Sequence, residues 1–340
     1  MRVLIFHGYL LRGTGSNVYN ASLAPALASL GHEVHLLCQD RNAAELEWVD
    51  AVGDWVDGRL EVRPTAGSAP GDGSITVYTP DIDGLLPVYV PDAYEGFRVK
   101  AFPELTDAEL DNYIEANVAA VREVADRAGG VDAALANHLI MGPVILARSG
   151  LPFAAKVHGS ALEYTVKPNP ERFLPYAREG MAAARTVLVG SRHTAASLWA
   201  AVGEPGLEAK TRFSPPGVDT RLFSPLAKAE APARLRALAT AVAADGDAPT
   251  SAAAWGREPR RAVAALESMA AADGARVVFV GKLIVSKGID LLLAAWPLVV
   301  ARNPGARLLI VGFGEYAEPA ERLWAAIAAG ELDAVAELAR

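Results

Sequence analysis

Short apolar runs alternate with longer segments of helical periodicity along most of the chain. Residues 3–6 form the first apolar run, and the segment after it places Val18, Leu23, Leu27 and Leu30 on one helical stripe. Buried parallel strands are apolar throughout and are joined by crossover helices. The pattern therefore predicts an α/β fold. The predicted strands are 3–6, 34–38, 133–136, 153–157, 187–189, 277–280 and 308–311, with long helices at about 107–128 and 172–184.

The segment 276–296 combines a strand, a turn and a helix with two cations. The run 277–280 predicts a buried strand that ends at Gly281, and apolar residues from Ile289 onward recur at helical spacing. Lys282 follows the strand and Lys287 stands at the start of the helix. A helix N-terminus with free N–H groups favours negative charge, so this arrangement suits a diphosphate. Solvated surface lysines are the alternative interpretation.

A second candidate lies at the first strand-to-helix junction. Gly13 and Gly15 precede the helix, where glycine allows the backbone to approach a ligand closely. Val18 occupies the third glycine position of a dinucleotide fingerprint, so the pattern is not that fingerprint. An ordinary helical N-terminal turn is the alternative.

Two histidines follow predicted strands. His158 ends the strand 153–157, and His138 follows the strand 133–136 after Asn137. Open α/β sheets bind ligands at the carboxyl ends of their strands. The positions therefore indicate site residues, with hydrogen-bonded structural histidines as the alternative.

Composition narrows the function classes. The 340 residues are 51% hydrophobic and 21% charged, with a net charge of −8, which argues against general nucleic-acid binding. The apolar run before His7 has only four residues, too few for a signal-peptide core. The helix after Ile289 contains Asp290 and Pro297, which argues against a membrane span. The single cysteine, Cys38, excludes an internal disulfide. We expect a cytoplasmic protein.

Composition shifts mark the predicted domains. Prolines at 215, 216 and 225 and an alanine-rich stretch at about 228–274 separate two strand-and-helix regions. We predict an N-terminal Rossmann-like domain at 1–224, an insertion or linker of two surface helices at 225–275, and the start of a second domain at 276–340. The segment 59–102, rich in Pro, Gly and Asp, is predicted to form loops and short strands.

The sequence motifs in these segments resemble those of one protein family. Gly281-Lys282-Leu283, Lys287-Gly288 and the following apolar helix resemble the phosphate-binding signature of retaining nucleotide-sugar glycosyltransferases with the GT-B fold, of the family-four (group 1) type. Lys282 stands where that family usually has arginine, so the bidentate fork is lost. Lys156-Val-His-Gly resembles the family's strand-and-histidine motif, and Pro215-Pro-Gly-Val-Asp219 resembles its inter-domain hinge.

The resemblance implies a GT-B architecture: two Rossmann-like parallel-sheet domains that face a cleft, the second incomplete here. It also implies roles for individual residues. His158 would contact the transferred sugar as the catalytic residue; Lys282, Lys287, Gly13 and Gly15 would bind the donor phosphates; Gly312 and Gly314 would lie near the donor base; His138 and Ser191 would line the cleft. No metal ligands are expected.

The implied activity is transfer of a hexose from a nucleotide diphosphate sugar to an acceptor hydroxyl, with retained anomeric configuration and no required cofactor or metal. The implied partners are that donor and a carbohydrate or lipid-linked acceptor, without nucleic acid or a transmembrane segment. Three alternatives remain open: a sugar-nucleotide epimerase of the same fold, a non-catalytic fragment that binds nucleotide or a partner, and, more distantly, a dinucleotide oxidoreductase.

Two further patterns complete the sequence interpretation. Asp81-Ile-Asp83 matches a two-aspartate metal motif of another glycosyltransferase fold, but Gly84 follows it in a Pro-rich loop, so a turn is predicted. The family's two glutamates in a later glycine-rich loop, which orient the donor, have no counterpart in the sequence. We therefore expect impaired activity of this 340-residue chain.

Overall fold

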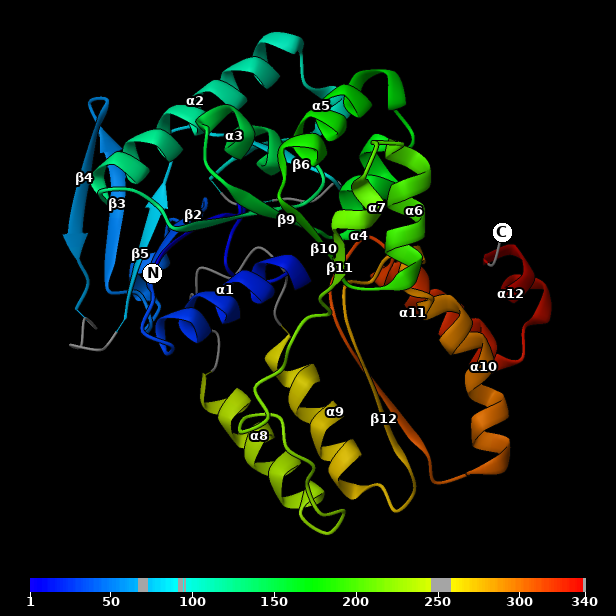
Figure 1. Cartoon of the computed structure of the whole chain (residues 1–340). Helices are drawn as coiled ribbons and strands as arrows, with labels where there is room; N and C mark the ends of the chain where they lie inside the picture. The colour runs from blue at the N-terminus through cyan, green and yellow to red at the C-terminus, as the bar shows by residue number, and fades with distance from the viewer. Residues whose placement is uncertain (67–72, 91–93, 95, 246–257, 339–340) are drawn as a thin grey trace. The chain divides into compact units, whose positions relative to one another are not determined.

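The computed structural model describes residues 1–66, 73–90, 94, 96–245 and 258–338 (Figure 1). Within these ranges the chain divides into two compact units, Met1–Val218 and Asp219–Arg340. The division falls earlier than the predicted boundary after residue 224, and the alanine-rich helices group with the second unit. Each unit is described by itself.

The first unit contains a nine-stranded sheet of order β11-β10-β9-β8-β1-β2-β5-β3-β4, parallel except where β3 pairs with β4. Its strands are β1 Arg2–Phe6, β2 Glu33–Leu37, β3 Ala51–Val56, β4 Arg59–Pro64, β5 Ser74–Thr79, β8 Ala133–Asn137, β9 Phe153–Val157, β10 Thr186–Val189 and β11 Thr211–Phe213. A separate pair joins β6 Leu85–Val88 to β7 Arg98–Ala101. The five strands predicted for this unit all form.

Helices cover both faces of this sheet, as expected for crossovers between parallel strands. They are α1 Gly15–Ala28, α2 Asp107–Arg127, α3 Gly142–Ser149, α4 Gly159–Ala161, a π-helical turn Leu162–Val166, α5 Pro170–Ala183, α6 Arg192–Val202 and α7 Leu207–Lys210. Figure 1 shows α1 on one face and α2, α3 and α5 on the other. Ala24 of α1 belongs to one buried apolar cluster, whereas α2, α3, α5 and α6 share a larger one.

The segment 59–102 is more regular than predicted. β5 lies inside the main sheet between β2 and β3, and β3 itself was not predicted. Ile75 and Val77 alternate with Ser74 and Thr76, a half-buried pattern unlike the continuous apolar runs of the other parallel strands. The predicted turn at Asp81-Ile-Asp83 is confirmed, because Asp81 Oδ1 accepts a hydrogen bond of 3.0 Å from the N–H of Asp83.

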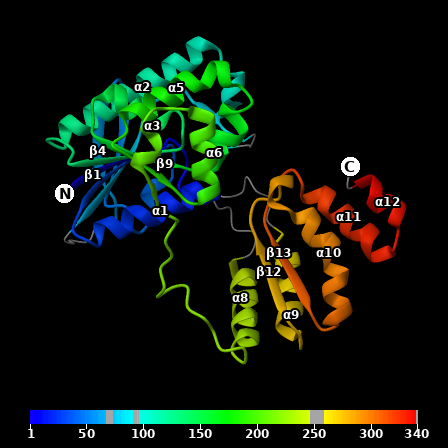
Figure 2. The ribbon, with the colours of Figure 1, turned by 45° about the vertical axis from the view of Figure 1, so that its right-hand side comes forward.

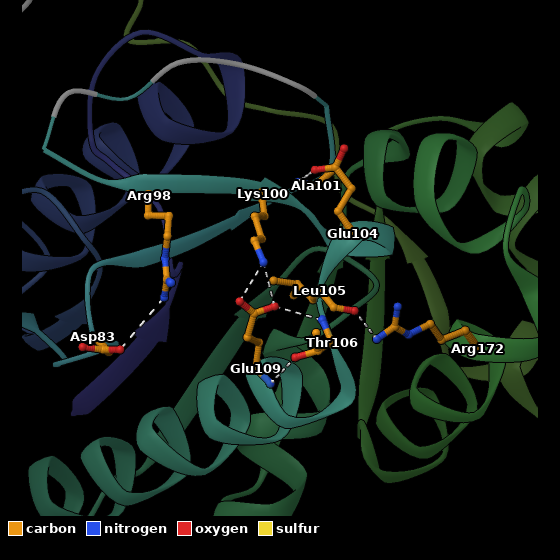
Figure 3. Close-up of polar contacts among 9 residues, drawn as sticks. All are labelled: Asp83, Arg98, Lys100, Ala101, Glu104, Leu105, Thr106, Glu109 and Arg172. Atoms are coloured by element: carbon orange, nitrogen blue, oxygen red, sulfur yellow. Dashed lines mark hydrogen bonds and ion pairs between the residues drawn. The ribbon is translucent and has the colours of Figure 1, made fainter.

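Charged side chains connect β7 to the start of α2 (Figure 3). Lys100 Nζ lies 2.7 Å from Glu109 Oε1, and Glu109 also accepts the Thr106 N–H while Thr106 caps α2 in return. These hydrogen bonds, from Lys100 first, lower the pKa of Glu109 to about 2. Arg172 of α5 donates to the Leu105 carbonyl at 2.6 Å. The capping box thus anchors the β6–β7 pair beside the helices.

The second unit holds a parallel two-stranded sheet with helices around it (Figure 2). Its elements are α8 Ala231–Asp245, α9 Pro259–Ala271, β12 Arg276–Val280, α10 Ile289–Arg302, β13 Arg307–Val311, α11 Ala317–Ala329 and α12 Leu332–Leu338. Both predicted strands and both alanine-rich helices form, while the predicted flexible segment near 245–251 falls mainly outside the described residues. The prediction that 277–280 is buried is wrong. Val278 and Val280, which lie on the same face of β12, are 52% and 75% exposed, whereas Phe279 on the opposite face packs against a buried apolar cluster.

No helix among the described residues has both the length and the apolar composition needed to cross a bilayer.

Candidate active site

Three histidines stand at the carboxyl ends of three neighbouring strands. His7, His138 and His158 directly follow β1, β8 and β9, which lie side by side and run parallel. The pairing of Phe6 with Ala136 brings these ends level. The ring centroids of His7 and His138 are 6.1 Å apart, and those of His138 and His158 are 5.1 Å apart. The sheet therefore gathers the three imidazoles at the edge where α/β proteins bind ligands.

A continuous series of hydrogen bonds joins two of these histidines. His158 Nε2 lies 3.1 Å from Asn137 Oδ1, and Asn137 Nδ2 donates to Asn20 Oδ1 at 2.9 Å. Asn20 Nδ2 lies 3.0 Å from His7 Nδ1, and His7 Nε2 lies 3.1 Å from Asn17 Oδ1. We call these five residues the His–Asn network. They lie on α1 and at the carboxyl ends of β1, β8 and β9.

The network extends to the glycine-containing loop predicted from sequence. Asn17 Nδ2 donates to the carbonyl of Arg12 at 2.7 Å, directly before Gly13. Gly13 adopts a positive φ of 93°, which glycine adopts without strain. Gly15 opens α1, and a side chain built there would meet nothing within 4 Å. The structure thus links the loop to His158 and leaves the space above Gly15 open.

His138 lies inside this arrangement rather than on a surface. It is 3% exposed, with a left-handed φ of 68°, and its ring packs against Tyr89 at 4.6 Å and Tyr9 at 5.5 Å. Neither ring nitrogen has a hydrogen-bond partner among the described residues. The sequence placed this residue on the cleft surface; the positive φ after Asn137 turns it into the protein instead.

Burial keeps all three imidazoles neutral. Desolvation lowers the pKa of His7 to about 4, against weaker opposing hydrogen bonds to Asn17 and Leu10. Desolvation and the neighbouring His7 and Lys156 lower the pKa of His158 to about 3. The pKa of His138 also falls well below its usual range, through desolvation and then the other two histidines. At neutral pH the site therefore holds uncharged rings.

Lys156 is an unpredicted component of the same edge. It is 1% exposed, its Nζ donates to the carbonyl of Ser214, and the ammonium lies 5.2 Å from the centroid of the Tyr19 ring. Burial lowers its pKa. The ring of Tyr19 also meets His158 edge-on at 5.4 Å. Lys156 therefore fastens the chain after β11 next to the histidines.

Ser191 has a structural explanation. It is exposed and stands at the N-cap of α6, where its Oγ accepts a hydrogen bond of 3.0 Å from the N–H of Thr194. Capping of this kind satisfies one of the free N–H groups of a helix start. The strand-to-helix turn at Ser191 is confirmed, and capping accounts for the serine without a ligand.

In the second unit, the predicted phosphate lysines lie around the start of α10. Lys287 is exposed and ends a 3₁₀ turn, Val285–Lys287, one residue earlier than the helix cap Gly288, whose φ is 68°. Lys282 is half-buried and makes contacts of its own. Asp290 in the first turn brings a competing negative charge to the same helix end, with its Oδ1 buried and unpaired among the described residues.

Gly312 and Gly314 are required by close packing of the backbone. A Cβ at Gly312 would lie 2.0 Å from the carbonyl oxygen of Gly281, and one at Gly314 would lie 2.4 Å from that of Leu283. The N–H of Leu283 also donates to the carbonyl of Phe313 at 2.6 Å. Both glycines therefore let the segment after β13 lie against the segment that carries Lys282. Their predicted proximity to the donor base stays a prediction.

Two hollows lie away from these residues. One of about 450 Å³ opens at the amino-terminal edge of the sheet, near Arg2 and Asp132, opposite the histidines. Another of about 380 Å³ lies between Asp81, Arg98 and Glu109, next to the contacts in Figure 3. Within the described ranges no group of three or more His, Cys, Asp or Glu side chains is arranged to hold a metal ion.

Sequence reasoning identified His158 and His138 but missed most of the network that surrounds them. His7, Asn17 and Asn20 were not singled out, and Asn137 was named only with its neighbour. The available signal was that a histidine follows each of three strands: 3–6, 133–136 and 153–157. What the sequence does not express is that β1 lies directly beside β8, which brings distant residues together.

Comparison with solved structures gives weak overall similarity. A glycosyltransferase from Rickettsia africae ESF-5 is 12% identical, with a TM-score of 0.46 over 99% of this chain and 65% of its own. The N-terminal domain of Candida albicans trehalose-6-phosphate phosphatase is 13% identical, with a TM-score of 0.49 over 99% of this chain and 68% of its own. Anabaena HepE, solved in complex with UDP-glucose, is 13% identical, with a TM-score of 0.47 over 95% of this chain and 71% of its own. The chain thus spans less than two thirds of the Rickettsia protein's length. No curated protein matches the sequence significantly.

Comparison with protein families identifies both units. Residues 14–217 match the family described as "Glycosyl transferase 4-like domain", and residues 274–338 match "Glycosyl transferases group 1". The first match covers most of the chain and includes the whole His–Asn network except His7. The chain therefore belongs to the GT-B glycosyltransferases that combine a glycosyl transferase 4-like domain with a group 1 domain.

Proposed function

We propose that the protein transfers a hexose from a nucleotide diphosphate sugar to a hydroxyl of a carbohydrate or lipid-linked acceptor, with retention of anomeric configuration and without a required metal. The observation that carries this proposal is the neutral His158 at the carboxyl edge of the sheet, linked to the open glycine loop at Gly13–Gly15. Membership in the family supports the choice of a nucleotide-sugar donor.

His158 acts in this proposal by orientation and not by proton transfer. A general base works best when its pKa lies near the working pH, whereas the pKa of His158 is lowered to about 3. A neutral imidazole can nevertheless accept or donate a hydrogen bond to a sugar hydroxyl. His158 thus positions the transferred sugar, and His138 supports it from inside the protein.

The second unit supplies positive charge to the leaving diphosphate. Lys287 is exposed beside the start of α10, where first-turn N–H groups face outward. Lys282 adds a second cation after β12. Stabilising the charge that develops on a leaving group is a large contribution to transferase catalysis. Because the sequence contains no counterpart of the paired donor-orienting glutamates, we propose that this 340-residue chain turns over slowly.

Donor binding can be measured without knowledge of the acceptor. We expect calorimetric titration of the 340-residue chain to show binding of uridine or guanosine diphosphate and of the matching nucleotide hexose. A nonspecific anion such as inorganic sulfate at equal concentration serves as the control. Equal, weak binding of all these anions would contradict the proposal.

A further inference from the structure

The direction of every hydrogen bond in the His–Asn network is fixed by main-chain carbonyl oxygens, which can only accept. Asn137 Nδ2 lies 3.3 Å from the carbonyl of Phe6, and Asn20 Nδ2 lies 2.8 Å from that of Ser16. Each of these amides must therefore direct its NH₂ group to the carbonyl, and its oxygen is left to accept. This determines the orientation of both amides from their surroundings alone.

Main-chain carbonyls also fix the hydrogen-bond directions of His7 and Asn17. The Nε2 of His7 lies 2.9 Å from the carbonyl of Leu10, so it carries the proton, and Nδ1 accepts from Asn20. Asn17 donates to the Arg12 carbonyl and presents its oxygen to His7. His7, Asn17, Asn20 and Asn137 are each at most 2% exposed, so water does not offer their side chains alternative hydrogen-bond partners.

The series of donors and acceptors ends at His158, where it determines which ring nitrogen carries the proton. Asn137 presents Oδ1, an acceptor, to His158 Nε2 at 3.1 Å, so Nε2 must carry the proton. In the neutral ring Nδ1 is then an unprotonated acceptor. No described residue forms a hydrogen bond to this Nδ1, and unlike the nitrogens of His138 it is not a buried unsatisfied atom.

We propose that Asn137 is a positioning residue that, supported by Asn20 and His7, holds His158 as the Nε2–H tautomer, so that Nδ1 accepts a hydrogen bond from a ligand hydroxyl. This rests on the proposed function for the identity of the ligand as a nucleotide sugar. It also defines what the position recognises. A hydroxyl can donate to Nδ1, whereas carbonyl and ionised phosphate oxygens cannot, so the edge selects the sugar and not the diphosphate.

The tautomer can be measured directly in the full chain. Long-range ¹H–¹⁵N correlation spectra of histidine-labelled protein distinguish the two neutral tautomers, and the chain has only six histidines. A His158→Gln variant assigns the signals. We expect His158 at pH 7 to give the Nε2–H pattern. The Nδ1–H pattern, or signals averaged between tautomers, would overturn the proposal.

Two substitutions of Asn137 separate positioning from packing. Asn137→Leu removes the acceptor, so we expect averaged His158 signals and nucleotide-hexose affinity weakened by up to about tenfold, with nucleoside diphosphate affinity unchanged. Asn137→Asp keeps an acceptor and adds charge, so the Nε2–H pattern should persist and the pKa of His158 should rise by about 1–3. Asn117→Leu is the matched control, because Asn117 is also buried and its side-chain amide donates to the carbonyl of Tyr113 in its own helix.

The outcomes distinguish this inference from the proposed function. An unchanged His158 pattern in Asn137→Leu, or an unchanged His158 pKa in Asn137→Asp, would show that Asn137 does not set the tautomer. The second test remains decisive if the leucine variant does not fold. Addition of UDP-glucose or GDP-mannose should shift the Nδ1 resonance, whereas UDP or GDP should not. Nucleotide-sugar binding without that shift would refute the acceptor role of His158 Nδ1. Absence of nucleotide-sugar binding would refute the proposed function and its ligand, while the spectra of the ligand-free protein still test the tautomer.

Discussion

Acidification from pH 7.5 to 4.5 is expected to cost the unit Met1–Val218 several kcal/mol of unfolding free energy because of its three buried histidines. The unfolded chain protonates each imidazole near pH 6.5. The folded protein resists protonation until about pH 4 at His7 and about pH 3 at His158. Between these values the unfolded state binds more protons, so the free energy of unfolding rises with pH and is lost as pH falls below about 6.5.

The groups around the cluster explain why no counter-charge prevents this loss. His158 faces Lys156, Tyr19 and His138, and His138 faces His7, Tyr9 and Tyr89. None of these is a carboxylate that could stabilise an imidazolium. With one pKa unit worth about 1.4 kcal/mol, each ring held neutral at pH 4.5 contributes a loss of roughly 2–3 kcal/mol. Such a total is comparable with the stability of many domains.

Native-state hydrogen exchange of peptides that cover β8 and β9, at pH 7.5 and 4.5, measures this loss in the first unit. The variant His138→Phe removes one titrating ring and two unsatisfied nitrogens. We expect the variant to be at least as stable at pH 7.5 and to lose less unfolding free energy on acidification than the unsubstituted protein, because burial holds the pKa of His138 well below its usual range. The variant is compared with the unsubstituted protein because carboxylates with a lowered pKa, such as Glu109, also reduce the unfolding free energy as pH falls, and they do so equally in both proteins.

The control is His193→Gln, which changes an exposed histidine outside the cluster and should leave the pH dependence unaltered. An identical acid loss in His138→Phe and in the unsubstituted protein would contradict the assignment of acid sensitivity to the buried rings.

Lys287→Ala is expected to weaken nucleoside diphosphate binding and, in any form of the protein that turns over, to lower kcat by about 10²–10³. The reason is the position of the exposed ammonium beside the cap of α10, where in the proposed function the helix and the lysine charge would act on the same phosphate. The neutral side chain leaves the helix cap at Gly288 unchanged, so the loss should be one of charge and not of folding.

Asp290→Asn is a matched variant with the opposite expected sign. It removes the carboxylate from the first turn of α10 and keeps the shape of the side chain. We expect a severalfold gain in diphosphate affinity, in line with about 0.3–1 kcal/mol for a charge at a helix end. Calorimetry of both variants at two salt concentrations measures the effects, which should shrink as salt increases. Affinity unchanged in both variants would remove the phosphate assignment.

Much of the fold could be predicted from local patterns. The strand 153–157 is a mostly apolar run and the helix 107–128 is long and periodic, and both form where expected. In this region β3 was not predicted and the short strands expected within 59–102 had no assigned bounds, because these strands alternate polar and apolar residues among turn signals and are ordered by tertiary pairing. The exposure of Val278 and Val280 was also missed, since an apolar run does not state whether both faces of its sheet are covered.

For the candidate site, the sequence located residues better than it described their surroundings. His158 was recognised from its place after a strand, but its protonation depends on contacts with residues more than 100 positions away, such as His7. The glycines at 312 and 314 have a structural reason that the sequence does not express. The resemblance implied a place near the donor base, which stays a prediction, and the structure adds that both glycines allow close backbone contact with Gly281 and Leu283.

The most direct test of the account is to identify what the protein makes from a nucleotide hexose. The 340-residue chain is incubated with the nucleotide hexose that it binds and a panel of carbohydrate and lipid-linked hydroxyl acceptors, and the products are followed by mass spectrometry and ¹H NMR. We predict slow, acceptor-dependent release of nucleoside diphosphate and a new glycoside with the anomeric configuration of the donor, abolished in Lys287→Ala. Conversion of the donor to an epimeric nucleotide sugar without acceptor, or a glycoside of inverted configuration, would contradict the proposed function.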